Sequence, residues 1–198
     1  MTAFRGPDVA TESKPKAILR KDYTPPDHWI DRTDLEFDLG EDGTVVRARL
    51  EIRRNEDRNA GDRPLVLMGE ELETRSVKID GRELSGDEFQ TTATELTIAS
   101  VPERFVLETE VLIHPENNTS LSGLYRSSGN FCTQCEAEGF RRITWYLDRP
   151  DVMSRYTTTI TGDRERYPVL LSNGNRISSD DLGDGRHLHL PTVLYHQP

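Results

Sequence analysis

Hydrophobic and polar residues alternate with a period of two along much of the chain. In residues 35–39 and 46–52, apolar side chains alternate with acidic or arginine side chains. Successive side chains of a β-strand point to opposite faces, so this alternation predicts strands with one buried and one exposed face. The Gly-Glu-Asp-Gly sequence at 40–43 predicts a hairpin turn between them. The same pattern predicts further strands at residues 65–68, 72–79, 96–99, 105–113, 155–160, 169–171 and 187–190.

Turn sequences separate these segments at short intervals. Asp80-Gly81, Asn173-Gly174 and Asp184-Gly185 are typical of tight turns, because glycine tolerates a positive φ angle. Only residues 140–147 show a helical pattern, and it stops before Arg149-Pro150. Many short strands with frequent turns predict a mainly β fold, an antiparallel saddle-like β-sandwich with little or no helix.

Composition and charge narrow the class of protein. The chain of 198 residues is long enough for one sizeable domain, and 34% of its residues are hydrophobic and 30% charged. Its net charge of −10 would repel phosphate backbones on average, so we expect no nucleic-acid partner. No basic amphipathic stretch and no run of about 18 apolar residues is present, which argues against a membrane partner. The N-terminal sequence lacks an apolar signal segment, and we therefore expect a cytoplasmic protein.

The histidines do not form a known zinc-binding motif. A zinc peptidase usually takes two metal ligands from an H-E-x-x-H sequence on one helix. None of the five histidines is followed by glutamate, so we expect neither a metal site nor catalytic residues of this kind in the chain. His187 and His189 would share one face of a strand, where two further ligands could complete a metal site. We expect instead that they are two surface histidines.

The two cysteines form a C-x-x-C pair, Cys132 and Cys135, which could be half of a tetrahedral zinc site or a redox pair. No second pair follows, and the flanking pattern lacks the strand-to-helix context of a thioredoxin-like site. We therefore expect two structural free thiols. A G-x-S-x-G nucleophile elbow and a glycine-rich phosphate loop are also absent from the sequence.

Residues 122–175 carry an unusual combination of short sequences: SGLY, CTQCEAEGFRRIT and YLDRPDV. Along this region the chain resembles the N-terminal domain of bacterial-type aminopeptidase N, a branch of the gluzincin zinc metallopeptidases. The sequence AILRKDYTPPD at 17–27 is similar to the start of the same domain. The resemblance covers residues 17–187 and is strongest after Ser122.

The resemblance implies a saddle-shaped, strand-rich domain that packs over a thermolysin-like catalytic domain. It implies that the complete enzyme uses zinc to remove N-terminal residues from peptides, as in peptide catabolism, so that peptide N-termini are its substrates. In this family the Gln and the first Glu of the Q-C-E triplet contact the first residue of the bound substrate. These positions match Gln134, which would line the pocket for the first side chain, and Glu136, which would hold the α-ammonium group.

The assignment of Glu136 has a physical basis, because only the end of a peptide carries a charged amine. An α-amino group has a reference pKa of about 8, is mostly protonated at neutral pH and offers three donors to a carboxylate. Without the resemblance, Glu136 is better explained as an exposed strand carboxylate paired with Arg141 or Arg142. Glu138 would point the same way as Glu136 on a regular strand and is the alternative anchor.

Two further expectations concern segments outside the Q-C-E triplet. Arg149, Pro150 and Asp151 are expected to fix a turn through an Arg–Asp pair. Residues 1–16 are predicted to be a flexible leader, 17–187 the β-domain and 188–198 a divergent tail.

The family pattern continues, beyond what this chain contains, with a G-A-M-E-N substrate loop and an H-E-x-x-H zinc motif. We therefore expect a fragment that lacks the catalytic zinc domain, is inactive alone and binds no zinc itself. Its expected partner is that thermolysin-like domain. The alternative is a stand-alone β-sandwich module that binds peptides or proteins without catalysis.

Overall fold

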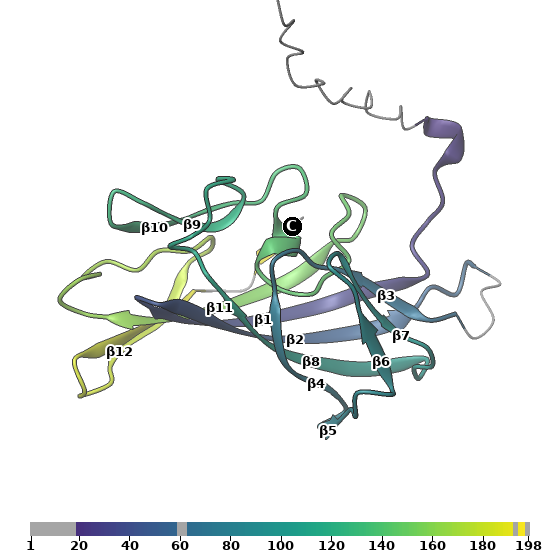
Figure 1. The fold of residues 1–198 in the computed structure, drawn as a ribbon, viewed down its shortest axis with the longest axis horizontal. Helices are drawn as coiled ribbons and strands as arrows, with labels where there is room; N and C mark the ends of the chain where they lie inside the picture. The colour runs from purple at the N-terminus through teal and green to yellow at the C-terminus, as the bar shows by residue number, and fades with distance from the viewer. Residues whose placement is uncertain (1–18, 59–62, 192–193, 197–198) are drawn as a thin grey trace, which may run out of the picture.

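The computed structural model of the protein describes residues 19–58, 63–191 and 194–196. Strands account for most of the described elements, and both helices are short 3-10 turns (Figure 1). The strands are β1 (His28–Gly40), β2 (Gly43–Arg54), β3 (Leu65–Met68), β4 (Glu73–Ile79), β5 (Arg82–Glu83), β6 (Phe89–Thr91), β7 (Glu95–Ile98), β8 (Arg104–Ile113), β9 (Gly123–Ser127), β10 (Asn130–Gln134), β11 (Ser154–Asp163), β12 (Arg176–Asp181), β13 (Arg186–Pro191) and β14 (Leu194–His196). The 3-10 helices are η1 (Arg20–Asp22) and η2 (Phe140–Arg142).

Nine of the described strands form one large sheet. Its order is β12-β13-β11-β1-β2-β8-β4-β5, with β14 paired to β11. The long antiparallel pairs β1–β2 and β2–β8 form its centre, and residues 40–43 make the hairpin turn of the first pair. Along β2 every second side chain, such as Val46 and Leu50, is buried. The mainly β fold and the strands predicted at 35–39 and 46–52 are therefore confirmed.

One pairing of the large sheet differs from the antiparallel arrangement that the sequence predicts. β1 and β11 run parallel, with Arg32 opposite Arg155 and Asp38 opposite Thr161. Parallel neighbours require a long crossover connection, and everything from β2 to η2 lies between these two strands in the sequence. The alternating pattern predicts which face of a strand is buried but carries no information about the direction of its neighbour.

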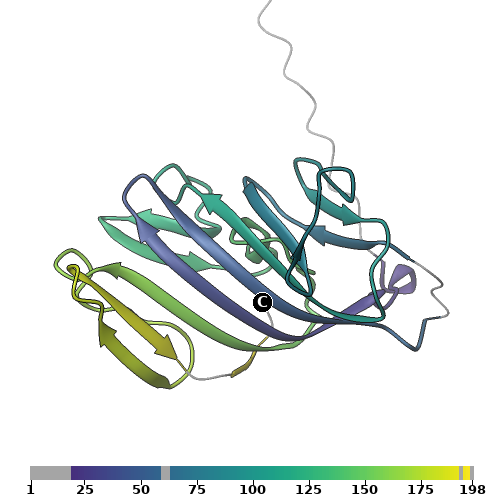
Figure 2. The same cartoon turned by 90° about the horizontal axis from the view of Figure 1, so that it is seen from below.

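A second layer covers one face of the large sheet. It contains the hairpin β9–β10, the turn η2 and the three-stranded sheet β3-β7-β6, and Figure 1 shows the hairpin above the long strands. Figure 2 shows how strongly the large sheet curves beneath this layer, which gives the domain its saddle shape. The core lies between the layers, where Leu50 and Leu107 of the large sheet and Leu67 of β3 are fully buried.

Several outward-facing side chains of the central strands form ion pairs. Arg47 and Glu110 are 2.8 Å apart across β2 and β8, and Arg53 and Asp31 are 3.0 Å apart across β2 and β1. Exposed pairs of this kind contribute about 0–1 kcal/mol each. Their main effect is to keep the outer face hydrated, while the apolar face provides the driving force for folding.

Two predicted elements were wrong. Residues 169–171 form no strand: Leu170 alone is buried, while Val169 and Leu171 are exposed. The helical pattern at 140–147 yields only the single turn η2. Tyr146, within that pattern, instead makes a β-bridge with Met68, because its backbone N–H and C=O pair with those of β3.

Several strands were not predicted, namely β5, β6, β9, β10, β12 and β14. Of the predicted segments at the ends of the chain, the leader 1–16 lies outside the described residues. The predicted boundary between the domain and the tail falls inside β13, which pairs with both β11 and β12. Among the described residues no helix has the length and hydrophobicity of a membrane span.

The packing of the core predicts the effect of a truncation at Leu67, which has no exposed surface. Leu67→Ala should lower the free energy of unfolding by about 2–5 kcal/mol, because a buried leucine loses its transfer energy and leaves a cavity. The measurement is equilibrium denaturation in urea. Leu171→Ala is the control, since this leucine is 78% exposed and should change stability by no more than about 0.5 kcal/mol. Equal losses in the two variants would contradict the assigned core.

Candidate functional site

The hairpin β9–β10 presents the Q-C-E triplet on the surface of the second layer. Gln134 is the last residue of β10, where it pairs with Gly123 of β9, and its side chain is exposed. The chain then leaves the strand and makes a turn at residues 136–139, in which the backbone N–H of Gly139 donates to the carbonyl of Cys135 at 2.8 Å. The peptide bond between Glu136 and Ala137 is cis.

Two glycines allow this turn to lie against the base of the hairpin. A Cβ atom on Gly139 would lie 2.5 Å from the carbonyl oxygen of Gln134. A Cβ atom on Gly123 would lie 2.6 Å from the Cβ of Arg142, and Gly123 has a φ of 75° that disfavours other residues. The turn, the start of β9 and η2 are therefore in direct backbone contact.

A buried carboxylate holds the chain just after the turn. Asp148 accepts hydrogen bonds from the backbone N–H of Arg141 at 3.1 Å and from its Nε at 2.9 Å. The guanidinium also donates to the backbone carbonyl of Asp148 at 3.2 Å. The Asp148 side chain is 1% exposed, so the pair is shielded from solvent and depends on these bonds.

The neighbouring arginine ties η2 to the three-stranded sheet. The Arg142 guanidinium is 2.9 Å from a carboxylate oxygen of Glu70 and 2.8 Å from one of Glu71. The backbone N–H of Glu70 donates to the carbonyl of Arg141 at 2.9 Å. The Arg142 side chain and the backbone of Arg141 thus both attach η2 to the segment that follows β3.

Below the turn, hydroxyl groups form a buried network. Tyr156 donates to the hydroxyl of Tyr146 at 2.8 Å, and the Thr33 hydroxyl lies 3.2 Å from that of Tyr146 and 2.8 Å from that of Ser154. Burial raises the pKa of Tyr156, so its phenol stays protonated and remains a donor. Burial, and to a smaller extent the nearby Asp148 carboxylate, raises the pKa of the Cys135 thiol to about 11.

The structure places the predicted site residues in different environments. Glu136 is exposed, and within the described part of the chain its side chain has no hydrogen bond or ion pair. The alternative explanation required Glu136 to pair with Arg141 or Arg142, and the structure shows neither pair. Glu138 lies 3.5 Å from the guanidinium of Arg141. Because β10 ends at Gln134, Glu136 and Glu138 do not lie on one regular strand, and the argument that they point the same way does not apply.

Other predicted features near the site can also be located. Arg149 binds both carboxylate oxygens of Asp151, at 2.8 and 2.7 Å, so the predicted pairing is confirmed. This turn also anchors the start of the domain, because Arg149 donates to the Thr24 carbonyl at 2.8 Å. Cys132 and Cys135 are free and half-buried.

The histidines of β13 do not indicate a metal centre. His189 is buried rather than a surface residue, and burial lowers its pKa. Nε2 of His187 lies 2.7 Å from the backbone carbonyl of Tyr167. Across the described residues, no three His, Cys, Asp or Glu side chains come together in a way that could hold a metal ion.

Sequence reasoning missed a cavity beside η2. The cavity has a volume of about 500 Å³ and lies between the second layer and the ends of β4 and β8. Its walls carry apolar side chains together with Glu73, His114 and Arg142. These residues are distant in sequence and share no motif, so only their meeting in three dimensions reveals the cavity.

Comparison with known proteins gives consistent matches. Residues 33–190 match the family described as the peptidase M1 N-terminal domain. The chain is 51% identical over 173 residues to Aminopeptidase N of Caulobacter vibrioides, covering 87% of this chain and 20% of that protein. It is 48% identical over 174 residues to Aminopeptidase N of Escherichia coli, covering 88% of this chain and 19% of that protein. The chain thus spans about a fifth of the length of these relatives.

Solved structures share the fold. Legionella pneumophila aminopeptidase A, in complex with aspartic acid, superposes with a TM-score of 0.83 at 34% identity, over 87% of this chain and 20% of that chain. An M1 zinc metallopeptidase mutant of Deinococcus radiodurans bound to Tyr-Ser-Ala has a TM-score of 0.68 at 15% identity, over 83% of this chain and 39% of that chain. The second likeness concerns the fold alone.

The buried pair beneath the turn generates a stability prediction. Asp148→Ala leaves Arg141 without its carboxylate in a shielded position, and should lower the free energy of unfolding by about 3 kcal/mol. Asp31→Ala, which breaks an exposed pair with Arg53, should cost no more than about 1 kcal/mol. Urea denaturation measures both. If Asp148→Ala is as mild as Asp31→Ala, the pair does not hold the turn.

Proposed function

Because the chain belongs to the peptidase M1 N-terminal domain family, we propose that it acts as the first domain of a zinc-dependent aminopeptidase and supplies the anchor for the substrate's free amino group. The family predicted from residues 122–175 is confirmed by the match to residues 33–190. The observation that carries the proposal is the exposed carboxylate of Glu136, which pairs with no described residue and lies on a turn whose base is fixed by buried contacts.

The chemistry of a peptide end suits this carboxylate. A protonated α-amine about 4 Å from a carboxylate has a gross Coulomb energy of about 4 kcal/mol at an effective dielectric constant of about 20, and less after desolvation. An internal peptide nitrogen carries no such charge. Glu136 can therefore favour chain ends over chain interiors once a second domain covers the turn and excludes water.

The structure distinguishes Glu136 from its neighbour Glu138. The Glu138 carboxylate lies near the Arg141 guanidinium, which neutralises part of its charge. Glu136 has no such partner within the described residues, so its charge is free for a ligand. Gln134 adds an amide that can donate and accept hydrogen bonds from the adjacent end of β10.

The hydrolytic step is assigned to a catalytic domain outside this chain. The described residues do not fit a zinc site, because they bring no three suitable ligands together. In such peptidases zinc polarises the peptide carbonyl and activates water. The part of this chain is to bind and orient the amine end, so that the first peptide bond reaches the catalytic groups of the other domain.

The purified 198-residue chain should not hydrolyse L-alanine p-nitroanilide, because it contains no H-E-x-x-H motif. The assay follows release of p-nitroaniline with added zinc, and the metal content of the protein is measured in parallel. Turnover that a chelator abolishes would contradict the division of roles proposed here.

The anchor role can be tested in a chimera. The segment of Caulobacter vibrioides Aminopeptidase N that matches this chain is replaced by this chain, and activity is measured on the same substrate. Glu136→Gln should reduce kcat/KM at least about tenfold, because the neutral amide loses the charge attraction to the amine. Glu103→Gln, an exposed substitution in the bend just before β8, is the matched control and should leave the activity unchanged.

Three results of the chimera experiment would count against the proposal. An unchanged kcat/KM in Glu136→Gln would remove the anchor from this residue. A larger loss in Glu138→Gln would transfer the role to that carboxylate. An inactive chimera that is folded would favour a stand-alone binding module over a peptidase domain.

A further inference from the structure

His114 lies between two carboxylates that come from different parts of the fold. Its Nε2 is 2.9 Å from Oε1 of Glu73, at the start of β4, and its Nδ1 is 2.9 Å from Oε1 of Glu116. A carboxylate oxygen can only accept a hydrogen bond, so each contact needs an N–H on the ring. Only the imidazolium form has both.

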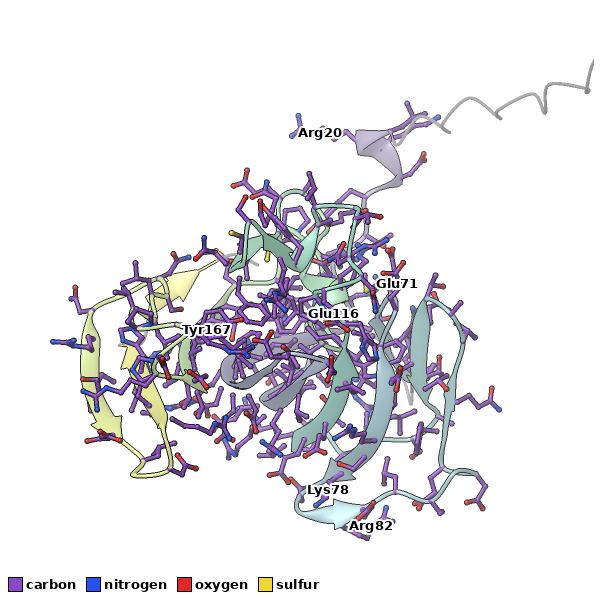
Figure 3. The ribbon with its side chains drawn as sticks, turned by 60° about the vertical axis from the view of Figure 1, so that its left-hand side comes forward. Arg20, Glu71, Lys78, Arg82, Glu116 and Tyr167 are labelled. Atoms are coloured by element: carbon purple, nitrogen blue, oxygen red, sulfur yellow. The ribbon has the colours of Figure 1, made fainter. Side chains whose placement is uncertain are left out.

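The charges around His114 favour that form. Glu116 and Glu73 hydrogen-bond to the ring and raise the pKa of His114 above its ordinary value of 6.5. The other charged side chains that line the cavity are Glu71 and Arg142, and they are paired with each other. Figure 3 shows Glu71 and Glu116 in the middle of the molecule, away from Lys78 and Arg82 at the other end of β4 and β5.

The two carboxylates differ in how easily they can release the ring. The Glu73 side chain is 64% exposed, so water can replace His114 there at little cost. The Glu116 side chain is 23% exposed, and its Oε1 also accepts from the Asn117 side chain at 3.2 Å. Its Oε2 is buried and accepts no hydrogen bond from any described residue, so Glu116 has less access to water than Glu73. A neutral imidazole will therefore keep its single N–H on Glu116 and release Glu73.

The loop that contains Glu116 supports the hairpin β9–β10. The Pro115 carbonyl accepts from the backbone N–H of Arg126 in β9 at 3.0 Å. The Asn118 side chain donates to the carbonyls of Ser122 at 2.7 Å and of Leu124 at 2.9 Å. Residues 114–118 are thus hydrogen-bonded to β9, the strand that pairs with β10 up to Gln134.

We propose that His114 is a pH-sensitive latch that, when protonated, ties Glu73 at the start of β4 to Glu116 in the loop supporting β9–β10, at the wall of the cavity. Deprotonation breaks the contact with Glu73, since a lone pair on Nε2 would then face a carboxylate oxygen. The ladder that pairs Glu73 with Leu112 keeps β4 in place, so the change is local: Glu73 and His114, which both line the cavity, no longer contact each other. The latch depends only on this chain and not on the peptidase role.

The direction of the pH dependence follows from the raised pKa. A histidine that binds its proton more tightly in the folded state stabilises the fold below about pH 6.5, the unfolded value. This contribution is lost as the pH rises through the higher folded pKa of His114. Burial lowers the pKa values of His28 and His189, so protonation of these two histidines destabilises the fold instead of stabilising it. They serve as internal references when the histidines are titrated.

The test is an NMR titration of this chain between about pH 5 and pH 9, following the ring protons of the histidines and the backbone amides. We expect His114 to titrate above 6.5, and the amides of residues 115–126 to shift with the same midpoint. Glu73→Gln and Glu116→Gln should each lower the pKa of His114, with the larger shift for Glu116→Gln, whose hydrogen bond is the larger cause. Glu103→Gln removes the same charge far from the ring and should leave it unchanged.

Each other outcome overturns the latch. A His114 pKa at or below 6.5 would mean that the two carboxylates do not hold the proton. A pKa unaffected by Glu73→Gln would mean that the tie to β4 does not form. Amides of residues 115–126 that ignore the titration of His114 would mean that the loop does not transmit it. Since Glu73 is exposed, its substitution tests the contact without disturbing the core.

Discussion

The arrangement of the second layer depends on the burial of one short strip of chain, residues 143–148. Tyr146 has no exposed surface, and its backbone pairs with Met68 through hydrogen bonds of 2.8 and 3.0 Å. Its hydroxyl is held by Thr33 and Tyr156 of the large sheet. An unpaired phenol or peptide group at this depth would cost about 1–3 kcal/mol, so the strip has few alternative positions. Both sheets are thereby connected through a single side chain and its own backbone.

Positioning and chemistry are assigned to different residues around this strip. Asp148 and Arg141 are shielded and fix the chain that follows the turn, whereas Glu136 and Gln134 face solvent. A carboxylate that stays hydrated does not pay a desolvation penalty in the free domain. The domain can therefore present an unpaired charge without losing stability, provided that buried contacts behind the charge determine where it points.

Local pattern predicted the long strands and, of the second layer, only β3 and β7. Alternation identified β1 and β2 because half of each strand is buried in one core. The hairpin β9–β10 was missed because its residues are mostly polar or glycine and are held by contacts to Pro115 and Asn118, which no local pattern reveals. Residues 169–171 are apolar, but no strand is available to pair with them among the described residues. In both failed predictions, contacts between residues distant in the sequence determined whether a strand formed.

The candidate site was predictable only in part, again because contacts between distant residues shape it. Gln134 and Glu136 were selected by resemblance to a family and not by any property of their own sequence context. The environment that separates Glu136 from Glu138 could not be predicted, because it depends on where Arg141 is held by Asp148.

The parallel pairing of β1 with β11 has a further consequence, which concerns the order of folding. Local hairpins such as β1–β2 can form early, whereas β11 can pair with the other edge of β1 only after more than a hundred further residues have been made. During synthesis the free edge of β1 is therefore exposed to wrong partners until the last third of the chain arrives.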